Sequence, residues 1–464
     1  MKKVLVLLGM LVIAACGAYK GPPNPVGNTT WRTKTLPVTF QSGEGNAEAG
    51  LHYLIYGDYI GSGIPYALIK KRMLKKPDAI LKREGINAYA PYMLNVFEAA
   101  NGATVASGNC FTCHASWFEG NMVIGMGNSF SDYRKDFLTA ARVINAGMNV
   151  KYSKKSKEWQ AYEDFGHYFR KMAPHIVTNQ PGGNPAFRLA EACMNYRNPV
   201  DLTYQKQANY EIPDYPIASD VPPLWHVKKK NALYYNGVGR GDFSKLLFQA
   251  SVLGIPDSAA ARKAVAHFRD VVAWVQSLEP PHYSKPIDQV LAAKGEVIFM
   301  EHCSGCHGTY GATETYPNKL VSLNVVKTDP LYAVNGMQSG IIEWYNSSWF
   351  AQSEPRSWFE PDTGYVAPPL DGIWITAPYL HNGSVPTLED LLNSPQRPVY
   401  WSRSGESTDY DYEKVGWRYE RPEKPKGKWT FDTTLPGYSN QGHYFGDKLS
   451  KEERKAVIEY LKTL

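Results

Sequence analysis

Two short motifs in this chain pair two cysteines with a histidine. The first is Cys-Phe-Thr-Cys-His at 110–114, and the second is Cys-Ser-Gly-Cys-His at 303–307. In this pattern two thiolates one helical turn apart add across the vinyl groups of a haem, and the following histidine binds the iron. A structural turn or zinc half-site is the alternative, but zinc would lack enough further ligands at short spacing. We therefore predict two covalently attached haem c groups, held by Cys110, Cys113, His114, Cys303, Cys306 and His307.

The remaining cysteines leave no room for a disulfide framework. Of the six cysteines, four belong to the two motifs and Cys16 has a separate role, so Cys193 is left without a partner. We expect Cys193 to be a small buried thiol.

The N-terminus has the layout of an export signal. Lys2 and Lys3 precede an apolar run from 4 to 15, which is too short for a permanent membrane helix. The ending Ile-Ala-Ala-Cys at 13–16 resembles a bacterial lipobox, which implies removal of residues 1–15 and lipidation of Cys16. A soluble export signal cut elsewhere is the alternative. Both place the protein in the bacterial cell envelope, facing the periplasm, and Gly17 favours the outer membrane by its similarity to Gram-negative sorting rules.

The charge pattern argues against nucleic acid as a partner. The net charge is only +6 over 464 residues, and the charges are interspersed. Residues 16–90 are predicted to form a tether and N-terminal extension, starting with a Gly- and Pro-rich stretch. The one tight basic run, 228–230, is expected to be a solvated face, with a dock for haem propionates or an acidic redox partner as the alternative.

An internal repeat predicts two units in tandem. Residues 222–237 (PPLWHVKKKNALYYNG) and 368–383 (PPLDGIWITAPYLHNG) align without a gap. Each copy is followed by a Leu-Leu pair and then by a closing amphipathic helix, expected at 262–278 and 452–464. We predict a mainly α protein with two cytochrome c-type domains, 91–281 and 286–464, each with one haem c and long irregular insertions.

Several motifs of the second unit resemble the di-haem cytochrome c peroxidase superfamily, which includes rubber oxygenases. They are Lys294-Gly295-Glu296 before the second haem motif, Thr328-Asp329-Pro330 and the run Thr-Ala-Pro-Tyr-Leu-His-Asn-Gly-Ser at 376–384. The stretches 431–437 and 442–446 look most like the rubber-oxygenase branch. Peroxidases of the family place a Met ligand about fourteen residues beyond the position of His381, where this chain has Pro395.

The two units differ in the histidines that could bind the sixth coordination position of the haem iron. An insertion between Leu392 and Leu449 carries His443 between glycines, and the first unit has no counterpart. We predict His443 as the sixth ligand of the second haem, with His381 as the runner-up. His381 has an alternative role as a conformational or propionate-contacting histidine. In the first unit Tyr235 stands at the position of His381.

The first haem lacks an obvious sixth ligand, so we expect it to be the reactive one. Its distal side would be lined by Leu233, Tyr234 and Tyr235, and Trp225 is the candidate for an aromatic relay between the haems. Glu163 and Glu191 lie in the interval where peroxidases of this family carry an acid/base carboxylate, although surface placement is the simpler expectation. Residues that could instead close the site are Met122, Met126, Met148, His167, Met172 and His175.

These expectations imply an oxidoreductase that uses peroxide or dioxygen. Its electron partner would be a small redox protein or a membrane electron-transfer chain, and its membrane contact would come through the lipid anchor. The alternative is a carrier in which both irons are six-coordinate. The organic substrate, if there is one, is not determined by fold resemblance.

Overall fold

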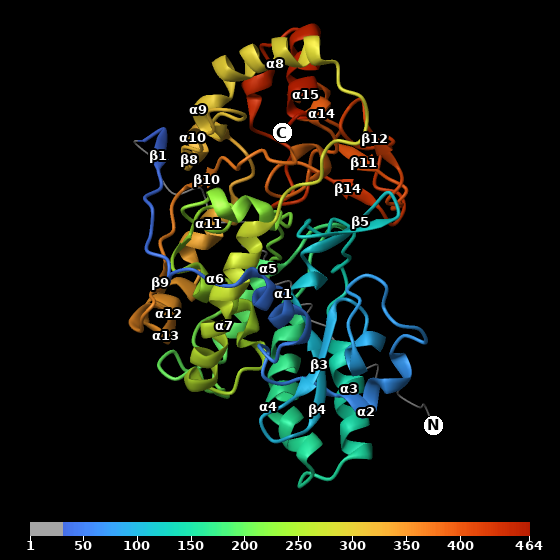
Figure 1. Ribbon diagram of the computed structural model, residues 1–464, viewed down its shortest axis with the longest axis vertical. Coiled ribbons are helices and arrows are strands. Elements are labelled where there is room, and N and C mark those ends of the chain that lie inside the picture. Colours follow the sequence, from blue (N-terminus) through green and yellow to red (C-terminus); the bar gives the residue numbers. More distant parts are fainter. Residues whose placement is uncertain (1–30) are drawn as a thin grey trace, which may run out of the picture.

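The computed structural model describes residues 31–464, so the predicted signal peptide and Cys16 lie outside the described residues. The secondary structure is mixed (Figure 1). The helices are α1 (Ala47–Tyr56), α2 (Tyr66–Ile69), α3 (Leu138–Lys151), α4 (Lys157–Met172), α5 (Ala186–Asn195), α6 (Phe243–Phe248), α7 (Ser258–Ser277), α8 (Gln289–His302), α9 (Ser304–His307), α10 (Leu323–Val326), α11 (Leu331–Gln338), α12 (Ile341–Ser347), α13 (Trp349–Gln352), α14 (Leu388–Leu391) and α15 (Lys451–Leu461).

Short antiparallel strands form several small sheets between the helices. The strands are β1 (Thr33–Thr35), β2 (Ile64–Pro65), β3 (Leu94–Glu98), β4 (Thr104–Gly108), β5 (Ala115–Phe118), β6 (Asn121–Ile124), β7 (Gly239–Gly241), β8 (Lys319–Ser322), β9 (Ser357–Phe359), β10 (Gly364–Val366), β11 (Tyr400–Ser402), β12 (Tyr410–Asp411), β13 (Gly416–Trp417) and β14 (Thr430–Asp432). Across the described residues, none of the helices is long and apolar enough to cross a membrane.

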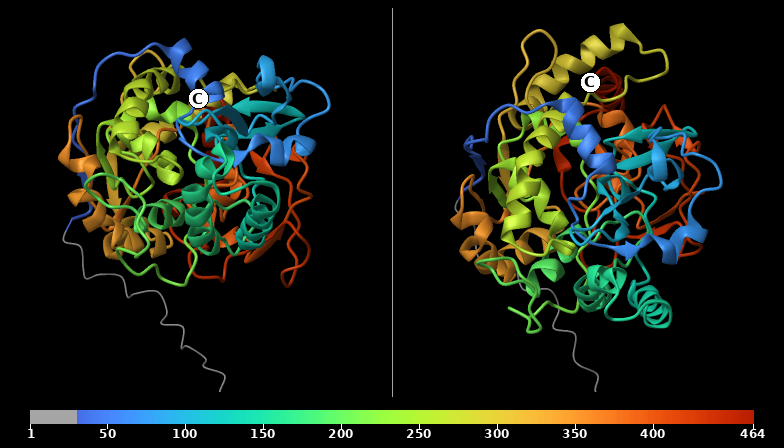
Figure 2. Two further views of the ribbon diagram at one scale, coloured as in Figure 1. Left: turned by 90° about the horizontal axis from the view of Figure 1, so that it is seen from below. Right: turned by 60° about the horizontal axis from the view of Figure 1, so that its bottom comes forward.

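Two pairs of helices pack side by side, and each pair has a glycine at its contact. At one end α8 packs along the C-terminal helix α15, and in the middle α1 packs along α7 (Figures 1 and 2). A Cβ on Gly295 of α8 would collide with the Ala456 carbonyl, and a Cβ on Gly50 of α1 would collide with the Asp270 carbonyl. Glycine has no side chain, so the two backbones can approach closely. In both pairs a glycine therefore packs directly against a backbone carbonyl of the partner helix. The expected closing helices correspond to α7 and α15.

The N-terminal extension is folded onto both units over its described part. Strand β1 pairs with β8 of the second unit, with Thr33 opposite Val321. Further along, the side chain of Gln41 donates to the Gly241 carbonyl of the first unit at 2.9 Å. Helix α1 then packs against α7, so this stretch connects the two units in space.

The units differ in where they carry their insertions. In the second unit α8 ends at His302 and leads directly into the second cysteine motif. Before the first motif, the sheet β2-β4-β3 joins β2 of the N-terminal extension to β3 and β4 of the first unit. The second unit is instead extended between α14 and α15, where β11–β14 lie. The units are also interlocked, because β7 of the first pairs with β9 of the second.

The repeat predicted from the sequence has the same backbone over its last residues, 233–239 in the first copy and 379–385 in the second. Leu233 forms an isolated β-bridge with Gly239, and the aligned Tyr379 forms one with Val385. The next residue adopts a positive φ in each copy, 71° at Tyr234 and 66° at Leu380. The aligned asparagines also match: the Oδ1 atoms of Asn236 and Asn382 accept the amide two residues on. The sequence repeat is therefore a structural repeat.

The two copies exchange hydrogen bonds at equivalent positions. The amide of Asp220 donates to the His381 carbonyl at 2.7 Å, and the amide of the aligned Val366 donates to the Tyr235 carbonyl at 2.7 Å. Trp225 donates from Nε1 to the carbonyl of Asp371, its own aligned residue, at 2.9 Å. Because aligned residues contact one another reciprocally, the two copies are related by a local pseudo-two-fold axis that passes near Trp225.

Candidate functional site

The second cysteine motif is built as a haem attachment site. Cys303 follows α8, and the short helix α9 carries the chain to His307. The Nδ1 atom of His307 lies 2.8 Å from the carbonyl oxygen of Pro368, the first residue of the second repeat copy. Metal-ligating histidines commonly donate their other ring N–H to a backbone carbonyl in this way. This contact fixes the ring and leaves Nε2 as the metal-binding atom.

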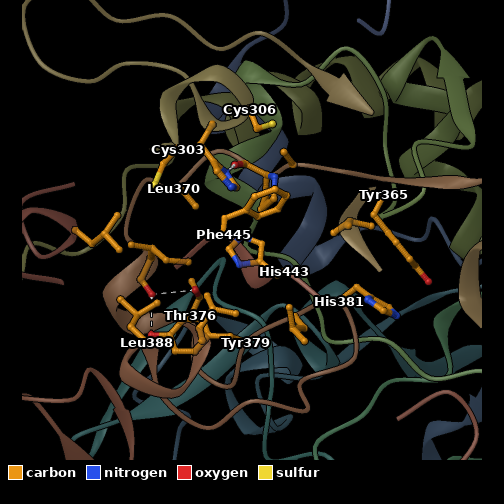
Figure 3. Close-up of a pocket in the computed structure, with 18 of the residues that line it drawn as sticks. Cys303, Cys306, Tyr365, Leu370, Thr376, Tyr379, His381, Leu388, His443 and Phe445 are labelled. Atoms are coloured by element: carbon orange, nitrogen blue, oxygen red, sulfur yellow. Dashed lines mark hydrogen bonds between the residues drawn. The ribbon is translucent and has the colours of Figure 1, made fainter. Parts of the chain in front are cut away.

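His443 faces His307 across the same cavity. The ring centroids of His307 and His443 are 6.2 Å apart, with an interplanar angle of 57°. Imidazole nitrogens bind metals at about 2.0 Å, and the ring centre lies roughly 1.1 Å further back, so two opposed histidines on one metal have centroids about 6.2 Å apart. Figure 3 shows His443 in the space below Cys303 and Cys306. The spacing fits a single iron between the two rings.

Backbone contacts and one arginine hold His443 in this place. Its amide donates to the Val326 carbonyl at 2.7 Å, and its own backbone has a φ of 52°. The guanidinium of Arg397 donates to the carbonyls of Asn440 at 2.6 Å and Gly442 at 2.7 Å, immediately before the histidine. Sequence reasoning missed Arg397, because an isolated arginine 46 residues upstream gives no local signal. It acts as a positioning residue for His443.

The cavity around these histidines suits a porphyrin. It has a volume of about 230 Å³ and is lined mainly by apolar side chains, among them Leu370, Leu392, Val457 and Leu461. Burial lowers the pKa of His443 to about 3, and burial also lowers the pKa of His307. Both imidazoles are therefore neutral near pH 7, which is the form that binds metal. The residues present thus fit a haem c attached at Cys303 and Cys306.

His381 occupies another part of the same cavity. Its ring stacks on Tyr365 with centroids 4.1 Å apart, and it lies to one side of His443 in Figure 3. Burial lowers the pKa of His381 to about 3, and its Nε2 atom is buried without a protein hydrogen-bond partner. Among the ring contacts of the described residues, His443 and not His381 is the histidine that meets His307. The geometry favours His443 as the second ligand.

The first cysteine motif has a different setting. A short 3₁₀ turn at Cys110–Thr112 begins at Asn109, whose side chain accepts the amide of Phe111 at 3.0 Å. Phe111 is fully buried and anchors the turn, whereas Cys110 and Cys113 are half-buried free thiols. Burial lowers the pKa of His114 to about 4, and its Nδ1 is buried without a protein hydrogen-bond partner. A neutral, unpaired imidazole beside two cysteines again fits a haem c.

Most of the competing ligands for the first iron are engaged elsewhere. Met148 packs with Trp159 in one cluster, and Met172 receives the Cys193 thiol at 3.6 Å in another. Cys193 is buried, as expected from its sequence context. Met126 belongs to the second large core, and His167 packs against Tyr204. The structure thus separates these three methionines and His167 into other contacts. His175 is half-buried at the end of the 3₁₀ turn Ala173–His175.

Met122 is one competing ligand that shares a core with the motif. It lies on β6 and packs, partly buried, against the same core as Cys110. Within the described residues, the ring contacts place no second histidine opposite His114, in contrast to the pair at the second motif. The two motifs are therefore unequal in the ligands that surround them.

The predicted distal and relay residues lie near the boundary between the two copies. Tyr234 packs, partly buried, against the core that also contacts Cys110, and its ring is 6.2 Å from that of Phe359. Leu233 is buried in that core. Tyr235 lines the cavity of the second motif, with its ring 6.3 Å from that of His381. Trp225 is buried on the pseudo-two-fold axis described above.

Neither of the two carboxylates proposed as an acid/base group has surroundings that suit that role. Glu163 is exposed on α4. Glu191 is buried, forms an ion pair with Arg188 and accepts from the Ser339 hydroxyl. Burial raises the pKa of Glu191, and these contacts lower it in part. Because its carboxylate contacts two buried partners, Glu191 stabilises the packing of α5.

The basic run at 228–230 is not a solvated face. Lys228 pairs with Glu279 at 2.6 Å, and Lys229 pairs with Asp371 of the second unit at 2.6 Å. Lys230 lines the cavity of the second motif. The expectation failed because the run forms the end of the 3₁₀ turn Leu224–Lys229, which is held between the two units.

A comparison with protein families finds a cytochrome c match in this part of the chain. Residues 364–402 match the family described as RoxA-like, cytochrome c-like. The matched segment includes the second copy of the repeat and the run at 376–384, and it supports a relation to cytochromes c of the rubber-oxygenase type. The stretches 431–437 and 442–446 lie outside the match. A cytochrome c-like domain implies covalently bound haem c, in agreement with the geometry at Cys303, Cys306 and His307.

Two curated proteins of Sinorhizobium fredii (strain NBRC 101917 / NGR234) are similar to parts of the chain. The uncharacterized protein y4iJ is 29% identical over 253 residues, which cover 40% of this chain and 41% of that protein. The uncharacterized protein y4iM is 29% identical over 244 residues, which cover 48% of this chain and 54% of that protein. The chain thus spans about half or less of the length of the curated relatives it matches.

Proposed function

We propose that this protein is an exported di-haem c-type cytochrome oxidoreductase with two unequal haems. In this proposal the haem held by Cys110, Cys113 and His114 is the site for peroxide or dioxygen, and the haem between His307 and His443 relays electrons. The observation that carries the proposal is the opposed pair of histidines at the second motif, which has no counterpart among the ring contacts of His114. Haem iron with an open position can bind small oxidants, whereas six-coordinate iron mainly transfers electrons.

The protein's own residues supply the surroundings for this division of work. The apolar lining around His307 and His443 excludes water from the relay site. Burial keeps His114, His307 and His443 neutral and thus ready to bind metal. Trp225 is buried at the contact between the two repeat copies, which supports its proposed role as an aromatic relay between the sites.

A pure electron carrier is the second candidate function. Met122 favours it, because this thioether packs against the same core as Cys110 and could close the first iron. In that case both irons would be six-coordinate and the protein would only transfer charge.

The surroundings in the cell are proposed from the sequence. We infer a periplasm-facing lipoprotein anchored through Cys16, with the outer membrane favoured over the inner one. Its electron partner would be a small redox protein or a membrane electron-transfer chain, and its oxidant peroxide or dioxygen.

The spin state of the two haems separates the two functions. The mature protein, loaded with haem, is examined by absorption and electron paramagnetic resonance before and after one-electron reduction. We expect one low-spin haem and one high-spin haem that shifts when cyanide, peroxide or oxygen is added. Two low-spin haems that ignore small ligands in both redox states would overturn the oxidoreductase proposal and leave the carrier.

A further inference from the structure

One lysine of the basic run differs from its two neighbours. Lys228 and Lys229 each pair with a carboxylate, Glu279 and Asp371 respectively. Lys230 forms no ion pair and no side-chain hydrogen bond with any residue in the part of the chain that the structure describes. Buried or half-buried cations are usually paired, because removing a charge from water is costly. An unpaired lysine at this place therefore calls for a counter-ion.

The position of Lys230 is fixed by the turn that precedes it. Trp225 and His226 both contact the Asp371 carbonyl, at 2.9 Å from each ring nitrogen. The amide of Lys230 then donates to the Val227 carbonyl at 3.1 Å and closes the turn. The first unit thereby presents Lys230 to the cavity that contains Cys303, Cys306 and His307 of the second.

The cavity itself offers Lys230 no negative partner. The one carboxyl group in its lining is Asp220. Burial raises the pKa of Asp220 well above its usual range, and the cation that acts on it is Arg403. Burial also lowers the pKa of Lys230 to about 8, without any compensating acid. The remaining titratable lining groups are histidines, tyrosines and the two cysteines, all neutral or positive near pH 7.

A haem carries two propionate carboxylates and would provide the missing charge. We propose that Lys230 of the first unit binds a propionate of the haem attached at Cys303 and Cys306, and that it raises the reduction potential of that haem. This inference rests on the proposed function only in that it requires a haem at the second motif. Because the aligned residue in the second copy is Thr376, the repeat supplies this cation in one copy only.

The expected consequence follows from simple electrostatics. A fixed positive charge near the cofactor favours the form with one more electron, and the interaction is strengthened in a cavity with few polar groups. Net charge and hydrogen bonding around a cofactor are recognised ways in which proteins tune its potential. Lys230 would thus make the second haem a better acceptor of electrons from the redox partner.

The test compares the haem-loaded protein with its Lys230→Met, Lys230→Arg and Lys228→Met variants. Potentiometric titrations followed by absorbance give both reduction potentials, and the low-spin resonance assigns one of them to the second haem. For Lys230→Met we expect the equilibrium constant for reducing the second haem to fall about tenfold, which is about 59 mV for one electron. Lys230→Arg keeps the charge and should stay near the parent, as should Lys228→Met.

The outcomes are distinct from those of the spin-state test. An unchanged second potential in Lys230→Met, with full haem content, would overturn the proposal, as would a shift confined to the first haem. If Lys230→Met does not fold, Lys230→Gln and the Arg variant give the same comparison, and their circular dichroism and haem content report the fold. The potential of the second haem can shift whether the first haem is open or closed, so either function is compatible with a positive result.

Discussion

The two copies of the repeat share the backbone of their last residues but carry different side chains. Both form the same bridge, the same positive-φ residue and the same asparagine contact. One copy presents Tyr235 where the other presents His381, and one presents Lys230 where the other presents Thr376. The shared backbone therefore brings Tyr235 and His381 into one cavity, with ring centroids 6.3 Å apart, while the side chains of the two copies differ.

The ligand that separates the two sites comes from outside the repeat. His443 lies in the insertion between α14 and α15, held by the Val326 carbonyl and by Arg397. At the first motif the added structure instead precedes Cys110 and comes partly from the N-terminal extension. The comparison teaches that the position of an insertion, more than the repeat itself, places a second histidine opposite one motif and not the other.

Removing one pair of cysteines should produce the largest difference between the two sites. Cys303→Ala with Cys306→Ala removes both thioether bonds of the second site, and we expect the covalent haem content to halve. The cavity among Leu370, Val457 and Leu461 would then lose its filling, and the free energy of unfolding should fall by several kcal/mol, about 24 cal/mol per Å³ of void. A pyridine haemochrome assay and intact mass measure the loss. The matched Cys110→Ala, Cys113→Ala variant should lose the other half; an unchanged content in either would contradict two attachment sites.

Replacing His443 should make the two sites more alike. In His443→Ala the second haem loses its sixth ligand, and we expect its low-spin resonance to be replaced by a high-spin one. His381→Ala is the matched control, because His381 lies in the same cavity but stacks on Tyr365. It should keep the low-spin signal while losing roughly 2 kcal/mol of stability from the lost packing. The reverse pattern, a high-spin haem only in His381→Ala, would assign the ligand to His381.

His226 should make the protein sensitive to acid. Burial, followed by the charge of Lys230, lowers the pKa of His226 to about 3 in the folded protein, against about 6.5 when unfolded. Between these pKa values the unfolded chain binds a proton that the folded chain does not. The free energy of unfolding is therefore undiminished by His226 above about pH 6.5, and it falls as the pH drops below that value. We expect the free energy of unfolding to fall between pH 7.5 and pH 5 by about 2 kcal/mol less in His226→Gln than in the parent protein. Denaturant unfolding at the two pH values measures this difference.

The exposed His282 provides the control for this pH dependence. His282→Gln should follow the pH dependence of the parent protein. Equal pH slopes in His226→Gln and the parent would show that another group accounts for the acid sensitivity. The aligned residue of His226 is Gly372, so this sensitivity belongs to one copy of the repeat.

The aligned glycines at the end of the repeat should give the smallest effect. Gly237 and Gly383 have φ values of 62° and 67°, so alanine at either position costs about 1 kcal/mol in backbone strain. A Cβ at Gly237 would lie 2.9 Å from a Val366 methyl group, whereas at Gly383 the nearest atom is Pro378 Cγ at 3.2 Å. Gly237→Ala should therefore be the more destabilising variant in thermal or denaturant unfolding; equal losses would mean that Val366 moves aside without cost.

The sequence by itself determined where haem attachment is predicted in this protein. The spacing of cysteines and histidine in each motif indicates haem attachment, because the bonds that form there are local. The gap-free repeat indicated matching backbones, and the histidine in the insertion after Leu392 pointed to His443. Local bonds and aligned patterns of this kind can be read without knowing the fold.

Only the tertiary structure decided what lies opposite each motif. The contact of His307 with Pro368, the 6.2 Å spacing to His443 and the support from Arg397 all join residues far apart in sequence. The same holds for Lys230, whose run has the composition of a solvated face but ends in the cavity of the other unit. Burial and opposition across a cavity depend on how the chain packs, and neither spacing nor composition encodes that packing locally.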